Sequence, residues 1–75
     1  VKKSRIFQNV VDQIRDAILE RRLNPGDMLP PERALRETFN VSRGTLREAL
    51  RVLEHMGLIE IKLGTGGGIY VKQAG

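Results

Sequence analysis

Apolar residues in the first quarter of the chain recur with the spacing of one buried helical face. They stand three or four positions apart or side by side, at Phe7, Val10, Val11, Ile14 and Ile18. This period predicts an amphipathic helix, for which Ser4 is the candidate N-cap. We expect the segment LNPGD at 23–27 to end it, because Pro25 cannot continue a helix and Gly26 suits a turn.

A second helix is predicted after two consecutive prolines. Residues 28–29 come directly before them and are expected to be extended, since a residue before proline is pushed toward β geometry. Pro30 and Pro31 suit the first turn of a helix, where a missing N–H leaves no hydrogen bond unmade. We expect the helix to run to Phe39, because Asn40 tolerates the left-handed backbone of a helix C-terminus.

A third helix is predicted after a short turn. Ser42 can cap a helix that starts at Arg43, although Thr45 with Glu48 offers a competing capping box one turn later. Gly57 is expected to stop this helix. Its apolar residues fall on one broad arc, at Leu46, Ala49, Leu50, Val52, Leu53 and Met56.

The last part of the chain alternates apolar and polar residues in two short segments. LIEIKL at 58–63 and IYVK at 69–72 have the two-residue period of strands, and GTGGG at 64–68 supplies a flexible hairpin turn. The order helix, short strand, helix, helix, hairpin predicts a mainly α fold with a small β-hairpin, the winged helix-turn-helix. In that fold the third helix enters the DNA major groove and the hairpin forms a wing beside it.

Length and composition indicate one small domain over residues 1–75. A chain of this length buries a core too small for a deep active-site cleft, so we expect it to belong to a larger protein or a dimer. It has no cysteine, which excludes disulfides and thiolate metal sites and fits a reducing, cytoplasmic setting. No segment has the length and apolar character of a membrane span or a signal peptide. The net charge of +4 favours a polyanionic partner.

Three arginines on the third predicted helix are the main candidates for DNA contact. Arg43, Arg47 and Arg51 are four positions apart and form one stripe outside the apolar arc. The alternative is a solvated face in which Arg51 pairs with Glu48 or Glu54. The start of a recognition helix is where side chains reach bases, which favours base or phosphate contact for Arg43 and Arg47 and leaves Arg51 undecided.

Smaller residues at the same helix end are candidates as well. Ser42 and Thr45 carry hydroxyls that can hold a phosphate, and for Ser42 capping is an equal and compatible role. Gly44 leaves room for the backbone to approach DNA closely. On the second predicted helix, Arg33 is a candidate phosphate contact, with an ion pair to Glu37 as the alternative.

The glycine-rich turn is the remaining candidate site. Four residues of the predicted wing tip either contact DNA or form a plain turn, namely Gly64, Thr65, Gly66 and Gly67. The run lacks the last glycine of GxGxxG and no lysine follows it, so neither a dinucleotide loop nor a P-loop is predicted. The single histidine, His55, has no partner at metal-binding or catalytic spacing. We therefore expect no enzyme activity, no metal and no cofactor.

With these residues in view, the chain resembles the DNA-binding domain of the GntR family of bacterial transcription regulators. The resemblance covers nearly the whole chain, through IRDAILERRLNPGDMLPPERALRETFNVSRGTLREALRVLEHMGLI and the wing GTGGGIYV. It implies phosphate contact by Ser42, minor-groove entry by Gly64 and operator contact by Arg33, Arg43, Gly44, Thr45 and Arg47. Pro31 and Gly44 depart from the family's pattern, which often has a small capping residue and a bulkier residue at these positions.

The same resemblance implies partners. It implies a cytoplasmic homodimer, associated with the nucleoid when bound, that represses or activates transcription at a pseudo-palindromic double-stranded operator. It also implies a small-molecule effector, bound by a following domain outside this chain. The wing GTGGGIYV and the segment LREALRVLEHMGLIE resemble the FadR subfamily, which points to an organic acid. A winged-helix module that binds a protein without binding DNA is the alternative hypothesis.

Overall fold

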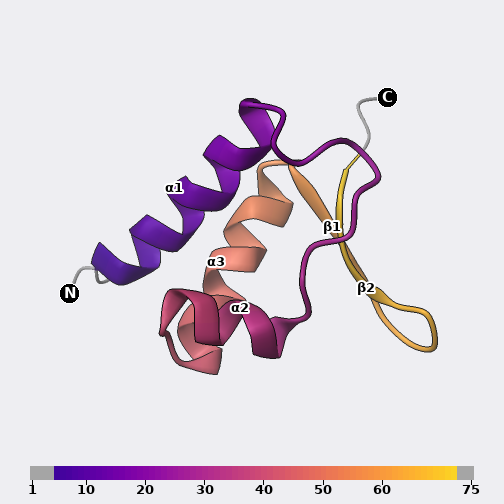
Figure 1. The fold of residues 1–75 in the computed structure, drawn as a ribbon. Coiled ribbons are helices and arrows are strands. Elements are labelled where there is room, and N and C mark those ends of the chain that lie inside the picture. Colours follow the sequence, from indigo (N-terminus) through magenta and orange to yellow (C-terminus); the bar gives the residue numbers. More distant parts are fainter. Residues whose placement is uncertain (1–4, 73–75) are drawn as a thin grey trace.

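The computed structural model describes residues 5–72, which form three helices and a two-stranded antiparallel hairpin (Figure 1). The elements are α1 (Arg5–Leu19), α2 (Glu32–Phe39), α3 (Arg43–His55), β1 (Ile59–Lys62) and β2 (Gly68–Val71). The predicted mainly α fold with a small hairpin is confirmed. The proposed N-cap Ser4 lies outside the described residues.

The core forms around α3, which contacts α1, α2 and β1. Four side chains of α3 are at most 3% exposed, namely Leu46, Ala49, Leu50 and Leu53. The other elements add the buried residues Val10, Val11, Ile14, Leu35, Ile59, Ile69 and Val71. Val52 and Met56 belong to the predicted apolar arc but are 37% and 47% exposed, because 100° per residue turns them away from the centre of the buried face.

The end of α1 differs from the prediction. The helix stops at Leu19, before the expected breaker at 23–27. Arg21 has a left-handed backbone (φ 66°), and the N–H groups of Arg22 and Leu23 both donate to the carbonyl of Ala17, at 2.9 and 3.1 Å. These bonds satisfy a carbonyl of the last helical turn, so the chain leaves the helix without a glycine or proline.

The predicted turn between α2 and α3 is confirmed. Asn40 is left-handed (φ 56°, ψ 52°), and its N–H donates to the carbonyl of Arg36. At the other end of α2, Pro31 is the extended N-cap and not part of the first helical turn, so the helix begins at Glu32. The Pro31 side chain cannot accept a hydrogen bond from the first N–H groups of the helix. The negative charge of Glu32 in the first turn instead stabilises this positive helix end.

Both ends of α3 are closed by local hydrogen bonds. The Ser42 side chain accepts from the N–H of Thr45, which confirms the start at Arg43; the competing start one turn later, with Thr45 as the cap, is wrong. At the C-terminus, Gly57 is left-handed (φ 81°) and donates to the carbonyl of Glu54, while Leu58 donates to the carbonyl of Leu53. This pair of bonds is a Schellman motif, and it directs the chain into β1.

The hairpin pairs Ile59 with Val71 and Lys62 with Gly68 at its two ends. β1 is shorter than the predicted 58–63, and β2 lies one residue before the predicted 69–72, so that Gly68, expected in the turn, belongs to it. The expected short strand at 28–29 is a single bridge between Met28 and Tyr70. None of the described helices has the length and apolar character needed to cross a membrane.

We expect Leu53→Ala to lower the free energy of unfolding by about 2–5 kcal/mol, because the Leu53 side chain is fully buried and its removal leaves a cavity. Urea denaturation followed by circular dichroism measures this loss. Val52→Ala is the matched control on the same helix and should cost less than about 1 kcal/mol. Equal losses for the two variants would contradict the central position of α3.

Candidate nucleic-acid interface

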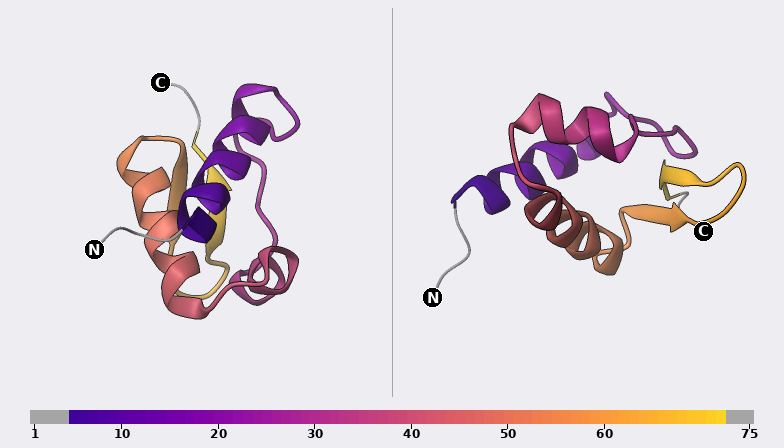
Figure 2. Two further views of the ribbon diagram at one scale, coloured as in Figure 1. Left: turned by 90° about the vertical axis from the view of Figure 1, so that its left-hand side faces the viewer. Right: turned by 90° about the horizontal axis from the view of Figure 1, so that it is seen from below.

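The N-terminus of α3 and the tip of the hairpin lie on the same side of the molecule. Both are at the lower edge of the ribbon in Figure 1, and the view from below in Figure 2 shows the hairpin loop extending beside α2 and α3. A groove of about 590 Å³ lies between these parts. Its walls include Glu32, Arg47 and Arg51 from the helices and Ile61, Lys62 and Gly67 from the hairpin.

The candidate arginines are exposed at this side of the fold. Arg33 lies in the first turn of α2, and Arg43, Arg47 and Arg51 follow one face of α3. Among residues 5–72, no ion pair joins Arg51 to Glu54 or Arg33 to Glu37. These two ion-pair alternatives are therefore not formed in this structure.

Arg47 has a partner that the sequence analysis missed. Its Nε donates to Glu32 Oε2 at 3.0 Å, across 15 positions of sequence. Residue spacing identifies partners only within one helix, whereas this contact joins α2 to α3, so the sequence carries no signal for it. The pair places a carboxylate beside one of the two arginines expected to contact DNA.

Ser42 and Thr45 are joined to each other at the start of α3. Ser42 Oγ accepts from the Thr45 N–H at 3.2 Å, and the Ser42 hydroxyl donates to Thr45 Oγ1 at 3.1 Å. The capping role predicted for Ser42 is confirmed. Gly44 stands between them with open space where a Cβ would project, and its φ is not positive. The fold therefore does not require a glycine at this position.

The glycines of the wing tip, in contrast, are required by the turn. The Gly67 N–H donates to the Gly64 carbonyl at 2.9 Å, and Gly64 and Gly66 have φ values of 89° and 77°. A Cβ at Gly67 would collide with the carbonyl oxygen of Lys62. Thr65, also predicted here, is exposed in the same turn.

Tyr70 braces the wing tip from β2. Its hydroxyl donates to the Gly66 carbonyl at 3.3 Å, and Lys62 Nζ lies 5.1 Å from the centroid of its ring. The second contact is a cation–π interaction of modest strength at an exposed site. The hydrogen bond ties the turn to β2, and the cation–π contact joins β2 to β1, so the tip projects from a defined hairpin.

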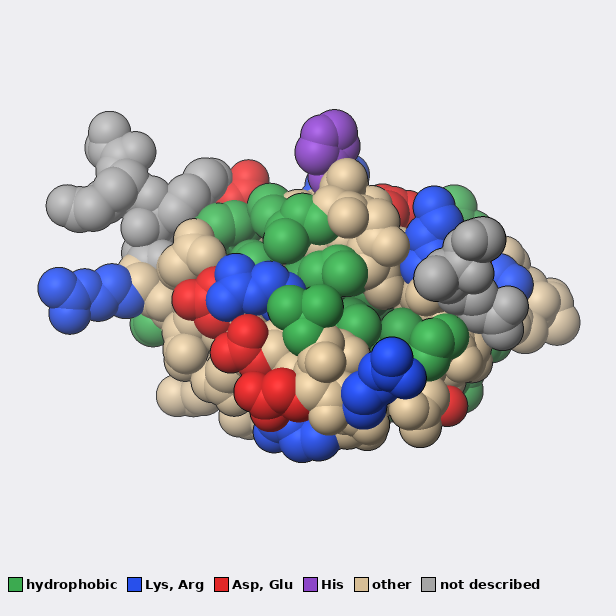
Figure 3. Space-filling view, turned by 90° about the horizontal axis from the view of Figure 1, so that it is seen from above, with side chains coloured by type: hydrophobic (Ala, Val, Ile, Leu, Met, Phe, Trp, Pro, Cys, Tyr) green, Lys and Arg blue, Asp and Glu red, His purple; other side chains and the backbone are tan. Residues whose placement is uncertain are grey.

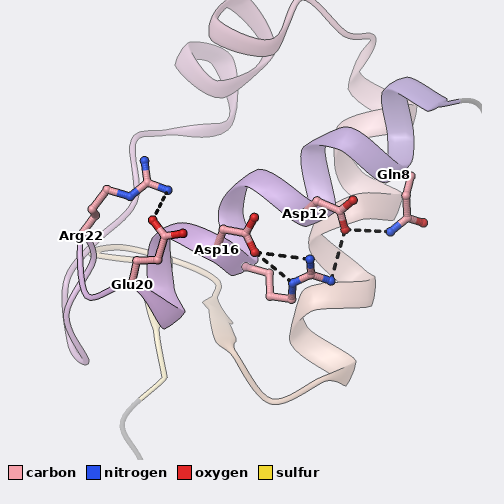
Figure 4. Close-up of polar contacts among 6 residues, drawn as sticks. Gln8, Asp12, Asp16, Glu20 and Arg22 are labelled. Atoms are coloured by element: carbon pink, nitrogen blue, oxygen red, sulfur yellow. Dashed lines mark hydrogen bonds and ion pairs between the residues drawn. The ribbon is translucent and has the colours of Figure 1, made fainter.

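The solvent face of α1 has a different electrostatic character. Asp12 and Asp16 both contact Arg15, at 3.2 and 3.3 Å, and Glu20 pairs with Arg22 at 3.2 Å (Figure 4). The view from above, on the side away from the α3 N-terminus and the wing tip, shows acidic, basic and apolar side chains interspersed (Figure 3). This side is thus largely neutralised by its own ion pairs. In residues 5–72 no group of three potential metal-ligating side chains comes together.

A model of the family described as bacterial regulatory proteins, gntR family, matches residues 6–71. Over 67 residues the chain is 48% identical to the Uxu operon transcriptional regulator of Escherichia coli K12, covering 89% of this chain and 25% of that protein. It is also 43% identical, over 68 residues, to the mannosyl-D-glycerate transport/metabolism system repressor MngR of the same organism, covering 91% of this chain and 28% of MngR. The chain thus spans about a quarter of the length of these relatives.

A solved structure gives the same result for the fold. The DNA-binding domain of AraR in complex with operator ORX1 has a TM-score of 0.81 and 30% sequence identity with this chain. The match covers 92% of this chain and 81% of the AraR chain. The arrangement of three helices and a wing is therefore that of a domain solved on its operator.

We expect Gly44→Ala to raise the free energy of unfolding by up to about 1 kcal/mol, because alanine is the better helix former and its Cβ meets no atom of the fold. Chemical denaturation monitored by circular dichroism measures the change. Gly67→Ala is the contrasting variant and should lower stability, since its Cβ collides with backbone. A loss of stability in Gly44→Ala would show that the fold itself needs this glycine.

Proposed function

This chain belongs to the gntR family of bacterial regulatory proteins, and we propose that it binds double-stranded operator DNA sequence-specifically, as the DNA-binding domain of a transcription regulator. The observation that carries the proposal is the position of Arg43 and Arg47. Both are exposed near the start of α3, directly after the helix-turn-helix turn, on the side where the wing tip projects. A recognition helix contacts bases with this part of its surface.

The residues around the start of α3 divide into two kinds of contact. Arg43 and Arg47 reach base edges in the major groove, where a guanidinium can bind guanine O6 and N7 together. Ser42, Thr45 and the first N–H groups of α3 hold a phosphate, because a helix N-terminus attracts anions. Gly44 lets the helix backbone approach the DNA, which explains a glycine that the fold does not require.

Two other elements contact the DNA beside α3. Arg33 binds a phosphate from the first turn of α2, the helix that crosses the backbone in this motif. The wing enters the minor groove with Gly64, Thr65, Gly66 and Gly67. Small residues suit this role because the minor groove is only about 6 Å wide.

We extend the proposal to the full-length protein. It acts in the cytoplasm as a homodimer on a pseudo-palindromic operator, is associated with the nucleoid when bound, and is controlled by a small-molecule effector such as an organic acid. It regulates transcription and catalyses no reaction. Dimer symmetry and operator symmetry belong together, because each half-site takes one domain. A protein-interaction module is not favoured, since the related AraR domain was solved on operator DNA.

Selection of bound sites from random duplexes by the full-length protein tests this function. We expect enrichment of two inverted half-sites whose centres are separated by a whole number of helical turns, about 10–10.5 base pairs each. Recovery of duplexes without a shared sequence would contradict sequence-specific binding. A single enriched half-site would contradict the homodimer and leave the domain's DNA binding intact.

We expect Arg43→Ala and Arg47→Ala each to cost about 1–3 kcal/mol in binding the selected operator and to relax specificity at one base pair. Arg33→Ala should instead weaken binding to all sequences alike and reduce the salt slope by about 1, as loss of one phosphate contact requires. Fluorescence anisotropy across a range of salt concentrations measures both quantities. Wild-type affinity in both Arg43→Ala and Arg47→Ala would refute the assignment of α3.

A further inference from the structure

The contact between Glu32 and Arg47 is unusual for a surface that binds polyanions. Arg47 is exposed on α3, with 61% of its side chain accessible, and it donates from Nε to the carboxylate of Glu32 at 3.0 Å. The Glu32 side chain is less accessible, at 33%, because it lies at the start of α2 and lines the groove. A carboxylate at this position repels phosphates, so its presence calls for a role.

The contact with Glu32 leaves the two terminal nitrogens of Arg47 available to bind a base. A guanidinium is planar and has five N–H donors, of which Nε carries one. Within the described part of the chain, the two terminal nitrogens of Arg47 have no hydrogen-bond partner. Holding Nε therefore restricts the plane of the group while its four remaining N–H bonds stay free for a base edge. Arg43 has no such restraint among residues 5–72.

Glu32 is itself held in place by the start of α2. It is the first residue of the helix, directly after the extended N-cap Pro31, whose ring fixes its own φ at −63°. The positive end of the helix favours a carboxylate at this position. The backbone at Glu32 is thus defined by the helix start, whereas Arg47 is more exposed and has the longer side chain with more rotamers, so the pair restricts the arginine more than the glutamate.

From these observations we propose that Glu32 is a positioning and specificity residue for DNA recognition by Arg47. Its carboxylate orients the terminal nitrogens of Arg47 toward a base edge, and it disfavours the competing contact in which Arg47 binds a phosphate. Both effects raise the ratio of operator affinity to affinity for unrelated DNA. The inference rests on the function proposed above, because it concerns how the same arginine distinguishes sequences.

A double-mutant cycle tests this role. Glu32→Ala, Arg47→Ala and the double variant are prepared in the full-length protein and measured on the selected operator and on a scrambled duplex of equal length. We expect Glu32→Ala to lower the affinity ratio about tenfold and to steepen the salt slope on scrambled DNA by about 0.9, as one new phosphate contact would. Both changes should be absent when Arg47 is already alanine.

Two further variants separate positioning from a structural or purely electrostatic role. Glu32→Gln retains an oxygen that can accept from Nε but has no charge, so its affinity ratio should lie between those of the wild type and Glu32→Ala. Glu37→Ala removes the same charge from α2 at an exposed position without an ion pair to Arg33 or Arg47, and it should leave the ratio unchanged. Thermal melting confirms that each variant is folded.

The outcomes distinguish this inference from the function on which it rests. A wild-type ratio in Glu32→Ala, or an equal fall with and without Arg47, overturns the positioning role while DNA binding stands. The same fall in Glu37→Ala reduces the role of Glu32 to its charge and also overturns it. If the wild type itself binds both duplexes equally, the proposed function and this inference fail together.

Discussion

The buried face of α3 is the constraint on which the other elements depend. Leu46, Ala49, Leu50 and Leu53 are its buried side chains, and α1, α2 and β1 all pack against this helix. Because a helix turns 100° per residue, burying these positions also determines which way the arginine stripe faces. The Schellman motif at Gly57 then sends the chain into β1 immediately after the helix. One packing surface thus sets both the direction of the arginines and the origin of the wing.

The wing depends on a second constraint, the segment between α1 and α2. Gly26 donates to the carbonyl of Val71, Val71 donates to that of Asp27, and Leu29 donates to that of Ile69. An isolated two-stranded hairpin is only marginally stable in water, so the hydrogen bonds from this segment to β2 stabilise the wing. The same segment leads through two prolines into α2 and to the Glu32–Arg47 contact. The wing and α2 are therefore joined through a short connection that contains two prolines.

The features that the sequence predicts well are those with local causes. Asn40 and Ser42 satisfy backbone groups within a few residues, so both ends of the helix-turn-helix turn follow from residue type. The left-handed Arg21 at the end of α1 has no such signature, because arginine is not a residue type that favours this conformation, although the bonds that close the helix are local. For the site, the period placed the arginines outside the core correctly. The partner of Arg47 depends on the angle between two helices, and no residue spacing encodes that angle.

The charged side chains serve two purposes, the attraction of DNA of any sequence and the recognition of particular bases. The carboxylates of Asp12 and Asp16 on α1, and that of Glu20 directly after it, pair with Arg15 and Arg22, so they offset little of the positive charge elsewhere. Within residues 5–72 no ion pair holds Arg33 or Arg43, and such charges add to the attraction of DNA of any sequence, beside the base contact proposed for Arg43. Within residues 5–72, Arg47 differs from Arg33 and Arg43 because a carboxylate holds it. An arginine paired with a carboxylate is attracted less strongly to phosphates. Its contact with DNA is then favourable mainly where a base edge accepts its hydrogen bonds, so it is better suited to distinguish one sequence from another.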